Sequence, residues 1–439
     1  MPRPAKSHQG DLMAPVLLLL VLLLGVGAPA AEPALPPQAA VASARPQATQ
    51  AGLAILDQGG NAFDAAVAVS AALAVVEPSG SGLGGGGFWL LHRAADGFEV
   101  MVDGRERAPL AAHRDLYLDA QGQVVPGLSL NGPLAAGIPG VPAALVHLAE
   151  AYGRLPLSGS LAPAIVLARE GFAIDPRLRA FAASRQAALR ASPAAAAQFL
   201  VDGAPPTEGY LLRQPDLAAT LEALSRQGRI GFYGGPIAER LVAGVRAAGG
   251  IWTLDDLAQY QAVERPPIIG HYRGWRVVSA APPAAGVLLV AMLNMLDTME
   301  TPSLTGAAGT HALVEVMRRA YRDRARYLGD PDQVTMPIAR LTDPDYAAGL
   351  IRDFDPARAT PSRLADLDCA AAGPAPGTPA EGRQTTHFSI LDREGNWVSA
   401  TLSVNYPFGS GFVPPGTGVL LNDEMDDFSA GPGSPAPTA

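Results

Sequence analysis

The chain has 439 residues, of which 48% are hydrophobic, so it has enough apolar side chains for a large buried core and is not disordered throughout. Its net charge of −9 argues against a nucleic-acid-binding protein, which would need a basic surface. The only lysine is Lys6 and the only cysteine is Cys369, which excludes lysine-dependent catalysis, intrachain disulfides and cysteine-rich metal sites.

Residues 1–30 have the pattern of a secretory signal peptide. Arg3 and Lys6 precede an apolar run over residues 16–26, and an A-x-A pattern ends at Ala30. The run is much shorter than the roughly 20 residues that span a bilayer. We therefore expect cleavage near Ala30, a periplasmic or secreted location in a bacterium, and no membrane span after the signal is removed.

Residues 47–102 predict two helices, a glycine-rich loop and a β-hairpin, in that order. Asn61 has the position of an N-cap and Asp64 that of its capping-box partner, and the alanine- and valine-rich helix that follows should be buried. The loop over residues 79–87 matches the glycine fingerprint of dinucleotide-binding proteins, but that fingerprint requires a helix after the loop, where this sequence predicts a strand. We interpret these glycines as a point where the backbone passes close to another segment.

The middle of the chain, residues 141–350, shows mainly helical periods. In the helix predicted over residues 310–328, one stripe is formed by Leu313, Met317, Ala320 and Tyr321. From residue 353 to residue 384 the chain is rich in proline and poor in large apolar residues, which is typical of a flexible linker or an exposed loop.

Two common kinds of catalytic site are not indicated by the sequence. The histidines are scattered without H-E-x-x-H spacing, so we expect neither a metal nor a cofactor. There is no G-x-S-x-G motif, so the usual nucleophile of serine hydrolases is missing.

The segment from Thr385 to Asn405 predicts a β-hairpin with its polar side chains on one face. Odd-numbered positions in the two strands carry mostly polar groups, and even-numbered positions are mainly apolar. If Arg393 at the turn lies opposite Trp397, Thr385 lies opposite Asn405 and Ser403 is a diagonal neighbour. An ordinary half-exposed hairpin would show the same alternation, so the pattern alone does not identify a site.

Five segments distributed over residues 47–429 resemble the γ-glutamyltransferase (glutathione hydrolase) family of N-terminal-nucleophile hydrolases. They read LDQGGNAFDAAVAVSAALAVVEPSGSGLGGGGF, DGRERAP, YLGDPD, QTTHFS and LLNDEMDDFS. The resemblance implies an α/β fold, namely a four-layer αββα sandwich, and a proenzyme that cleaves itself between Gln384 and Thr385. It divides the mature chain into a large-subunit region (31–352), the proline-rich linker (353–384) and the beginning of a small-subunit region (385–439). After cleavage the two pieces would stay together as a heterodimer.

The same resemblance implies the chemistry. The Thr385 hydroxyl would attack the carbonyl of Gln384, and hydrolysis of the resulting ester would leave Thr385 as a new N-terminus. Its α-amine, with a reference pKa of about 7.7–8.0, would serve as general base. Thr385 would then accept the acyl group of glutathione or another γ-glutamyl compound and pass it to water, an amino acid or a dipeptide. Neither a metal nor a cofactor takes part.

The resemblance also implies a role for each further site residue. Arg105 would bind the α-carboxylate of the substrate, which suits its planar guanidinium. Asn405, Glu424 and Asp427 would bind the α-ammonium group, and Ser403 would support the hydroxyl of the nucleophile. Arginine and carboxylate side chains are usually only solvated surface groups, so these assignments depend on the resemblance.

The chain also departs from the family pattern. Family members continue well beyond the D-D-F-S segment, into a region with a serine pair for the carboxylate and a glycine pair for the oxyanion hole. We therefore expect the sandwich to be incomplete at its C-terminus. Residues 281–286, APPAAG, also lack the serines that the family tends to have after the prolines.

Three functions remain open on the sequence. The first is a γ-glutamyl hydrolase and transferase, the second is a related acylase that acts on glutaryl or cephalosporin-type amides, and the third is a truncated, catalytically inactive remnant. An acylase does not need carboxylates that bind an ammonium group, so Glu424 and Asp427 favour the first.

Overall fold

The computed structural model describes residues 36, 38–299, 305–361 and 385–428. The predicted signal peptide, Gln384 and most of the predicted linker lie outside these residues. None of the described helices combines the length and the apolar character that crossing a membrane requires. The division of the chain into subunit regions stays a prediction.

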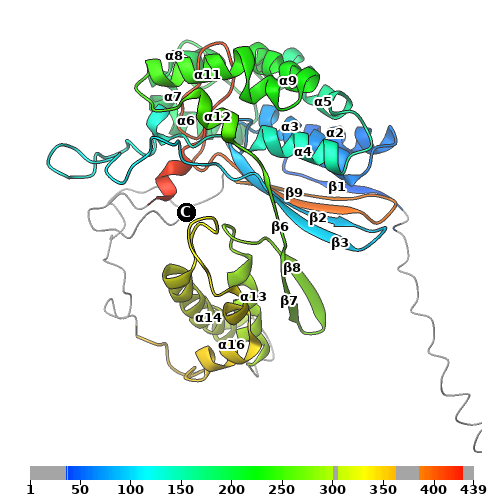
Figure 1. Ribbon diagram of the computed structural model, residues 1–439, viewed down its shortest axis with the longest axis vertical. Helices are drawn as coiled ribbons and strands as arrows, with labels where there is room; N and C mark the ends of the chain where they lie inside the picture. The colour runs from blue at the N-terminus through cyan, green and yellow to red at the C-terminus, as the bar shows by residue number, and fades with distance from the viewer. Residues whose placement is uncertain (1–35, 37, 300–304, 362–384, 429–439) are drawn as a thin grey trace, which may run out of the picture.

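Helices and strands are distributed along the whole described chain (Figure 1). The strands are β1 (Ala40–Ala42), β2 (Gly86–Arg93), β3 (Phe98–Asp103), β4 (Phe172–Ala173), β5 (Leu211–Leu212), β6 (Val263–Arg265), β7 (Ile268–Tyr272), β8 (Trp275–Ser279), β9 (Thr386–Leu391) and β10 (Trp397–Ser403). The helices are α2 (Pro46–Asp57), α3 (Ala62–Val76), α4 (Val141–Ala151), α5 (Leu157–Glu170), α6 (Pro176–Ser184), α7 (Gln186–Ala191), α8 (Pro193–Phe199), α9 (Pro215–Gln227), α10 (Ile230–Tyr233), α11 (Gly235–Ala247), α12 (Leu254–Gln259), α13 (Gly286–Asp297), α14 (Gly306–Tyr327), α15 (Ile338–Leu341) and α16 (Pro344–Ile351), with the short 3₁₀ helices η1 (Pro133–Ala135) and η3 (Glu424–Asp427).

Six strands form one antiparallel sheet in the order β1-β9-β10-β2-β3-β6. The late strands β9 and β10 pair with each other and also with strands from the beginning of the chain, β9 with β1 and β10 with β2. The two strands that follow Thr385 are therefore inner strands of the sheet. The hairpins β4-β5 and β7-β8 form separate two-stranded sheets.

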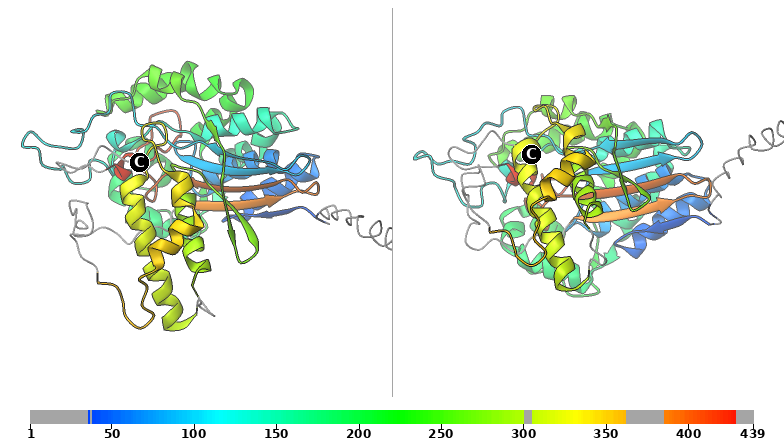
Figure 2. Two further views of the ribbon diagram at one scale, coloured as in Figure 1. Left: turned by 60° about the horizontal axis from the view of Figure 1, so that its bottom comes forward. Right: turned by 90° about the horizontal axis from the view of Figure 1, so that it is seen from below.

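Helices lie on both sides of the six-stranded sheet. Helices α2 to α5 cover one face, and α13, α14 and α16 lie on the opposite side with the β7-β8 hairpin (Figures 1 and 2). Every residue of α3 is buried, as its sequence predicts. On the other side, Leu90 and Met101 of the sheet pack in one apolar cluster with Ile268 of β7 and Val287 of α13. This mixture of helices and sheet confirms the predicted α/β class.

The start of α3 has the predicted capping box. Asn61 Oδ1 accepts hydrogen bonds from the N–H groups of Phe63 and Asp64, both at 3.0 Å, and Asp64 Oδ2 accepts the N–H of Asn61 at 3.0 Å. The Asp64 carboxylate also accepts the N–H groups of Arg154 and Leu155. The cap therefore both starts the helix and ties it to the loop before α5.

The glycine-rich loop passes close to another segment, as predicted. Gly84 forms an isolated parallel bridge with Leu421. A Cβ added to Gly84 would lie 2.8 Å from the carbonyl carbon of Leu420, and a Cβ added to Gly85 would lie 2.9 Å from Val404 Cγ1. Side chains at these positions would push the neighbouring segments away, so the loop requires glycine there.

The β9-β10 hairpin has the predicted faces but a different register. Even-numbered residues of both strands are buried, while the odd-numbered ones are exposed or half-buried. Leu391 pairs with Trp397, and the register continues until Thr385 lies beside Ser403. The prediction that Thr385 lies opposite Asn405 is therefore wrong.

The turn of the hairpin explains this difference. Asp392 Oδ1 accepts the N–H groups of Glu394 at 2.9 Å and Asn396 at 3.0 Å, so the hairpin closes at the pair Asp392–Asn396 rather than at Arg393. Asp392 Oδ2 accepts the N–H of Ala62 at the start of α3, at 2.9 Å. Because Ala62 is 330 residues away in the chain, no local pattern contains this contact.

The stripe predicted for α14 is wrong in part. Met317 and Tyr321, which were expected to be buried, have exposed fractions of 45% and 50%. The buried face carries Ala312, Val316 and Ala320 and, beside them, the charged residues Glu315, Arg319 and Asp323. Arg319 donates to the Glu315 carboxylate at 2.6 Å, so the charges on this face are paired with each other, which a count of apolar residues does not detect.

Candidate active site

Four chain segments reach the same end of the six-stranded sheet. Thr385 immediately precedes β9, Ser403 ends β10, Gly86 begins β2, and Arg105 follows the end of β3. Neighbouring strands run antiparallel, so the start of one strand lies beside the end of the next. The sheet therefore brings Thr385 and Arg105 to one place although they are far apart in the sequence.

The hydroxyl of Thr385 lies beside a second hydroxyl. Thr385 is exposed, and its Oγ1 lies 3.2 Å from Ser403 Oγ. Ser403 Oγ accepts the N–H of Asn405 at 2.9 Å. Because that bond uses a lone pair of Ser403, the O–H of Ser403 is available to donate to Thr385 Oγ1. This arrangement fits the supporting role predicted for Ser403.

Asn405 connects this pair of hydroxyls to the segment over residues 422–427. Its backbone has a φ of 71°, in the left-handed region that asparagine tolerates better than most residues. Its Nδ2 donates to the carbonyl of Asp423 at 3.0 Å, so its Oδ1, the acceptor of the amide, points away from that carbonyl. Asn422 donates to the carbonyl of Gly84 at 2.7 Å and thus anchors the segment to the glycine-rich loop.

The predicted substrate-binding residues meet in a cluster of charges. Arg105 Nη1 lies 2.5 Å from Glu424 Oε1, and Arg105 Nη2 lies 2.9 Å from Asp427 Oδ2. The Glu424 side chain is nearly buried, whereas that of Asp427 is half exposed. The structure thus brings the three residues together. In it Arg105, predicted to bind the substrate carboxylate, pairs with Glu424 and Asp427, predicted to bind the substrate ammonium. We call these three residues the Arg105 triad.

Burial changes the protonation of the Arg105 triad. It raises the pKa of Glu424 to about 7, and the charge of Arg105 opposes that shift. Burial disfavours the charged form of Arg105 itself, but the charges of Glu424, Glu106 and Asp427 outweigh this effect and raise its pKa. The charge of the triad is therefore sensitive to pH near neutrality.

Glu106 is a site residue that the sequence does not single out. Its Oε1 is buried and has no hydrogen-bond partner in the described part of the chain. Burial, followed by the charge of Glu424, raises the pKa of Glu106 well above its usual range. A Cβ added to Gly86 would lie 2.6 Å from Glu106 Cδ, so the glycine at the start of β2 makes room for this carboxyl. The DGRERAP motif contains Glu106, but no local signal separates an inward-facing acid from a solvated one.

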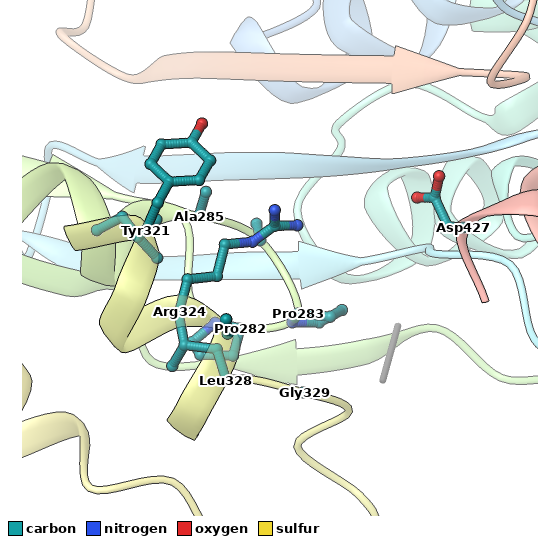
Figure 3. Close-up of a pocket in the computed structure, with 11 residues that line it drawn as sticks. Pro282, Pro283, Ala285, Tyr321, Arg324, Leu328, Gly329 and Asp427 are labelled. Atoms are coloured by element: carbon teal, nitrogen blue, oxygen red, sulfur yellow. The ribbon is translucent and has the colours of Figure 1, made fainter. Parts of the chain in front are cut away.

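Two cavities adjoin the Arg105 triad. The first, of about 310 Å³, is lined by Arg324, Asp427 and the loop over residues 282–285 (Figure 3). The second, of about 320 Å³, is lined by Arg105 and several other charged residues. Pro283 lines both cavities, so the loop that departs from the family pattern lies between them.

The predicted cleavage bond is described on its Thr385 side only. Gln384, on the other side of the predicted cleavage bond from Thr385, lies outside the described residues. Among the residues that the structure does describe, no three His, Cys, Asp or Glu side chains are placed together so that they could hold a metal ion.

The fold and this site define a class of protein. A threonine stands at the exposed start of an inner strand, its hydroxyl lies beside a second hydroxyl, and helices lie on both sides of the sheet. This is the arrangement of an N-terminal-nucleophile hydrolase. Within that class, the chain belongs to the gamma-glutamyltranspeptidase family, whose model matches residues 48–438. The predicted family is thereby confirmed.

Individual relatives agree with this assignment. The chain is similar to the glutathione hydrolase proenzyme of Pseudomonas sp. (strain A14), with 42% identity over 400 residues, which is 90% of this chain and 68% of that relative. Among solved structures it is similar to Helicobacter pylori gamma-glutamyltranspeptidase, with 38% identity, a TM-score of 0.71, and coverage of 73% of this chain and 93% of that one. It is also similar to cephalosporin acylase from Bacillus halodurans, with 30% identity, a TM-score of 0.78, and coverage of 93% and 73%. These structures confirm the predicted fold class.

Proposed function

We propose that this chain is a self-cleaving γ-glutamyl hydrolase and transferase that uses Thr385 as its nucleophile on glutathione and related γ-glutamyl amides. The observation that carries the proposal is the position of Thr385. Its hydroxyl is exposed, lies 3.2 Å from Ser403 Oγ, and stands at the end of the sheet where the Arg105 triad also lies. The names of the relatives, glutathione hydrolase proenzyme and gamma-glutamyltranspeptidase, support the same reaction.

Self-cleavage needs only water and groups that belong to this chain. Thr385 Oγ1 attacks the carbonyl carbon of Gln384, the bond from that carbon to the Thr385 nitrogen breaks, and the hydroxyl proton ends on the nitrogen. Water then hydrolyses the ester, which leaves a carboxylate on Gln384 and a free α-amine on Thr385. The two pieces stay together as a heterodimer because β9 and β10 are held between β1 and β2 of the other piece.

In the mature protein the α-amine of Thr385 acts as general base. Its reference pKa of about 7.7–8.0 leaves a useful fraction unprotonated near neutral pH. The amine takes the hydroxyl proton while Oγ1 attacks the γ-carbonyl carbon, and it returns that proton to the leaving amine as the C–N bond breaks. Water, an amino acid or a dipeptide then takes the acyl group from Oγ1. Ser403 keeps the hydroxyl oriented throughout.

The Arg105 triad fits the charged end of a γ-glutamyl group, which carries an ammonium and a carboxylate on one carbon. The substrate carboxylate would take the place of Glu424 and Asp427 as the ion-pair partner of Arg105. The substrate ammonium would take the place of Arg105 as the ion-pair partner of the two acids. Asn405 Oδ1 would be a further acceptor for the ammonium. This exchange gives every charge of the triad a partner both with and without substrate, so that no buried charge is left alone.

A related acylase is the second candidate, because cephalosporin acylase from Bacillus halodurans has a TM-score of 0.78 with this chain. A glutaryl group carries a carboxylate but no ammonium. It would occupy Arg105 and leave Glu424 and Asp427 without a cation, which is unfavourable for partly buried carboxylates. The two acids therefore favour γ-glutamyl substrates.

The proposed location follows from the N-terminal sequence. Residues 1–30 would direct the chain across the bacterial inner membrane and be removed, so that the mature protein works in the periplasm or outside the cell. Glutathione and other γ-glutamyl compounds would reach it there as donors.

Expression of the full chain tests the first step. Denaturing electrophoresis and intact-mass spectrometry should show two fragments divided between Gln384 and Thr385. Thr385→Ala should remain one chain, and Thr385→Ser, which keeps a hydroxyl, should still divide. If the unsubstituted protein stays intact under all conditions, the proposal fails and the third alternative, an inactive chain, is correct.

Two chromogenic amides then separate the two enzymatic candidates. A γ-glutamyl anilide and a glutaryl anilide differ only in the α-ammonium group that the acids of the Arg105 triad would bind. We expect kcat/KM for the γ-glutamyl anilide to be at least about tenfold higher, since an unpaired buried charge costs about 1–3 kcal/mol. A preference for the glutaryl anilide would assign the chain to the acylases.

A further inference from the structure

Arg105 lies just beyond the part of β3 that the sheet holds. Strand β3 pairs with β6 as far as Asp103 and Val263, and Gly104 exchanges two backbone hydrogen bonds with Gly87 at 2.9 and 3.1 Å. Within the described residues, no backbone group bonds to the N–H or the carbonyl of Arg105. The side chain of an arginine is long and has several rotatable bonds, so its guanidinium keeps a defined position only if its backbone is fixed. Other groups must therefore fix the backbone of Arg105.

Two side chains take the place of the sheet at Arg105. The N–H of Arg105 donates to Asp103 Oδ1 at 2.9 Å, and the hydroxyl of Tyr260 donates to the carbonyl oxygen of Arg105 at 2.7 Å. Asp103 belongs to the DGRERAP motif, whereas Tyr260 lies 155 residues further along the chain. Tyr260 comes shortly before β6, which runs antiparallel to β3, so it lies beside the residues that follow β3 (Figure 1). The peptide groups on both sides of Arg105 are thus held.

The surroundings of Tyr260 hold its hydroxyl in this position. The side chain is buried, and its ring stacks on that of Tyr233 with 5.5 Å between the centroids and 7° between the planes. A Cβ added to Gly140 would clash with the hydroxyl oxygen of Tyr260, so this glycine leaves room for it. Arg229 donates to the backbone carbonyl of Tyr260 at 2.5 Å. Burial raises the pKa of Tyr260 well above its usual value, so the hydroxyl keeps the proton that it donates.

We propose that Tyr260 is a positioning residue of the active site, whose hydroxyl fixes the backbone of Arg105 so that the guanidinium meets the α-carboxylate of the substrate. The inference rests on the proposed function, because that function assigns the carboxylate to Arg105. Tyr260 acts through Arg105 and not on the reacting atoms, since the one proton of its hydroxyl is already donated to the carbonyl of Arg105. Loss of the hydroxyl should therefore weaken binding of the carboxylate without slowing the chemical step.

Removal of one hydroxyl tests the proposal. Tyr260→Phe keeps the ring that stacks on Tyr233 and leaves the carbonyl of Arg105 without its partner, so the backbone of Arg105 can turn. KM for a γ-glutamyl anilide should rise about five- to tenfold, which corresponds to one buried hydrogen bond, and kcat should stay within about twofold.

Tyr233→Phe is the matched control. Tyr233 is also buried and lies in the same stack, but its hydroxyl donates to the carbonyl of Pro139 at 2.7 Å. This variant should lose a similar amount of stability in thermal unfolding and keep KM within about twofold. An equal rise in KM in both variants would overturn the proposal, because the loss of any buried hydroxyl in this stack would then have the same effect.

Donors with and without the carboxylate show whether the effect passes through Arg105. A γ-glutamyl anilide and a glutaryl anilide both carry the carboxylate, whereas a γ-aminobutyryl anilide keeps the ammonium group and lacks the carboxylate. In Tyr260→Phe, kcat/KM should fall about five- to tenfold for the first two donors and less than about twofold for the third. An equal fall for all three donors would overturn the proposal, since Tyr260 would then support the site as a whole. Unchanged kinetics with all three would overturn it as well.

A binding measurement separates failure of this inference from failure of the proposed function. Calorimetric titration with L-glutamate requires no turnover and is made on the unsubstituted protein, on Tyr260→Phe and on Tyr233→Phe. Binding that is about five- to tenfold weaker in Tyr260→Phe alone supports the inference even if no donor is hydrolysed. Equal binding to all three proteins refutes it even if donors are hydrolysed normally. If glutamate does not bind to the unsubstituted protein, the placement of the carboxylate on Arg105 is wrong, and the inference fails with it.

Discussion

Replacement of Gly84 by alanine should weaken the contact that holds the segment over residues 422–427 against the sheet. The carbonyl of Gly84 accepts the backbone N–H of Asn422 at 3.1 Å and its Nδ2 at 2.7 Å. A Cβ on Gly84 would lie 2.8 Å from the carbonyl carbon of Leu420 and 3.0 Å from the Cα of Leu421. Ordinary carbon–carbon contacts are about 3.5–4.0 Å, so the carbonyl carbon of Leu420 alone requires the two segments to separate by about 0.7–1.2 Å, and the carbonyl oxygen of Leu420 lies nearer still.

The expected loss is about 1–5 kcal/mol of the free energy of unfolding, the sum of the clash and of two stretched hydrogen bonds. Overpacking of this kind costs about 1–3 kcal/mol, and each stretched hydrogen bond costs up to about 1 kcal/mol. This is a large share of the roughly 5–15 kcal/mol by which proteins are stable. The same movement displaces Glu424, which follows Asn422 closely in the chain, away from Arg105. Gly84→Ala should therefore also slow turnover of γ-glutamyl substrates.

Gly82→Ala is the matched control in the same loop. Its Cβ would lie 3.7 Å from Val404 Cγ1, which is an ordinary contact. Both substitutions restrict the unfolded chain to a similar extent, about 0.4–1 kcal/mol, so the difference between them reports the clash in the folded state. Urea unfolding followed by tryptophan fluorescence should give a much lower midpoint for Gly84→Ala and a free energy within about 1 kcal/mol of the unsubstituted protein for Gly82→Ala. Equal midpoints for the two variants would refute the reasoning.

Three further predictions concern the nucleophile, the triad and the hairpin turn. Ser403→Ala removes the hydroxyl 3.2 Å from Thr385 Oγ1 and should slow self-cleavage about tenfold; an unchanged time course on denaturing gels would show that Ser403 does not position the nucleophile. Because burial raises the pKa of Glu424 to about 7, its carboxylate gains a proton as the pH falls through that value, and KM for a γ-glutamyl anilide should rise on acidification. Glu424→Gln should have a high KM that depends much less on pH. If KM of the unsubstituted protein does not change with pH, Glu424 does not bind the ammonium group. Asp392→Ala removes the acceptor of the N–H groups of Ala62, Glu394 and Asn396, and should lower the free energy of unfolding in urea by about 3 kcal/mol. A loss below about 1 kcal/mol would mean that the hairpin register does not depend on this turn.

Features that depend on neighbouring residues were predictable. The capping box of Asn61 and Asp64, the buried helix α3 and the alternating faces of β9 and β10 each involve positions a few residues apart, so spacing and periodicity reveal them. Thr385 is different, because the alternation alone does not distinguish it from any threonine in a hairpin. Its assignment as the nucleophile required the long motifs shared with the family.

Features that depend on distant contacts were not predictable. The register of the hairpin depends on Asp392, whose partner Ala62 comes from the start of α3. On the buried face of α14, Arg319 pairs with Glu315 one turn away on the same helix and, at 2.7 Å, with Asp353, which lies beyond α16 in the chain. An apolar count treats such charged positions as exposed, so it placed Met317 and Tyr321 on the stripe instead.

The motifs show which chemical groups the candidate site contains, and the fold sets how those groups are paired. Arg105, Glu424 and Asp427 are visible in the motifs, but their mutual ion pairs exist because the end of β3 and the helix η3 meet at one end of the sheet. Arg324 resembles the other arginines of α14 in sequence, and only the fold places it in a cavity with Asp427. The residue type determines the chemical group of a side chain. The fold determines the distances to other groups and the burial of that side chain, and these set its partners and its pKa.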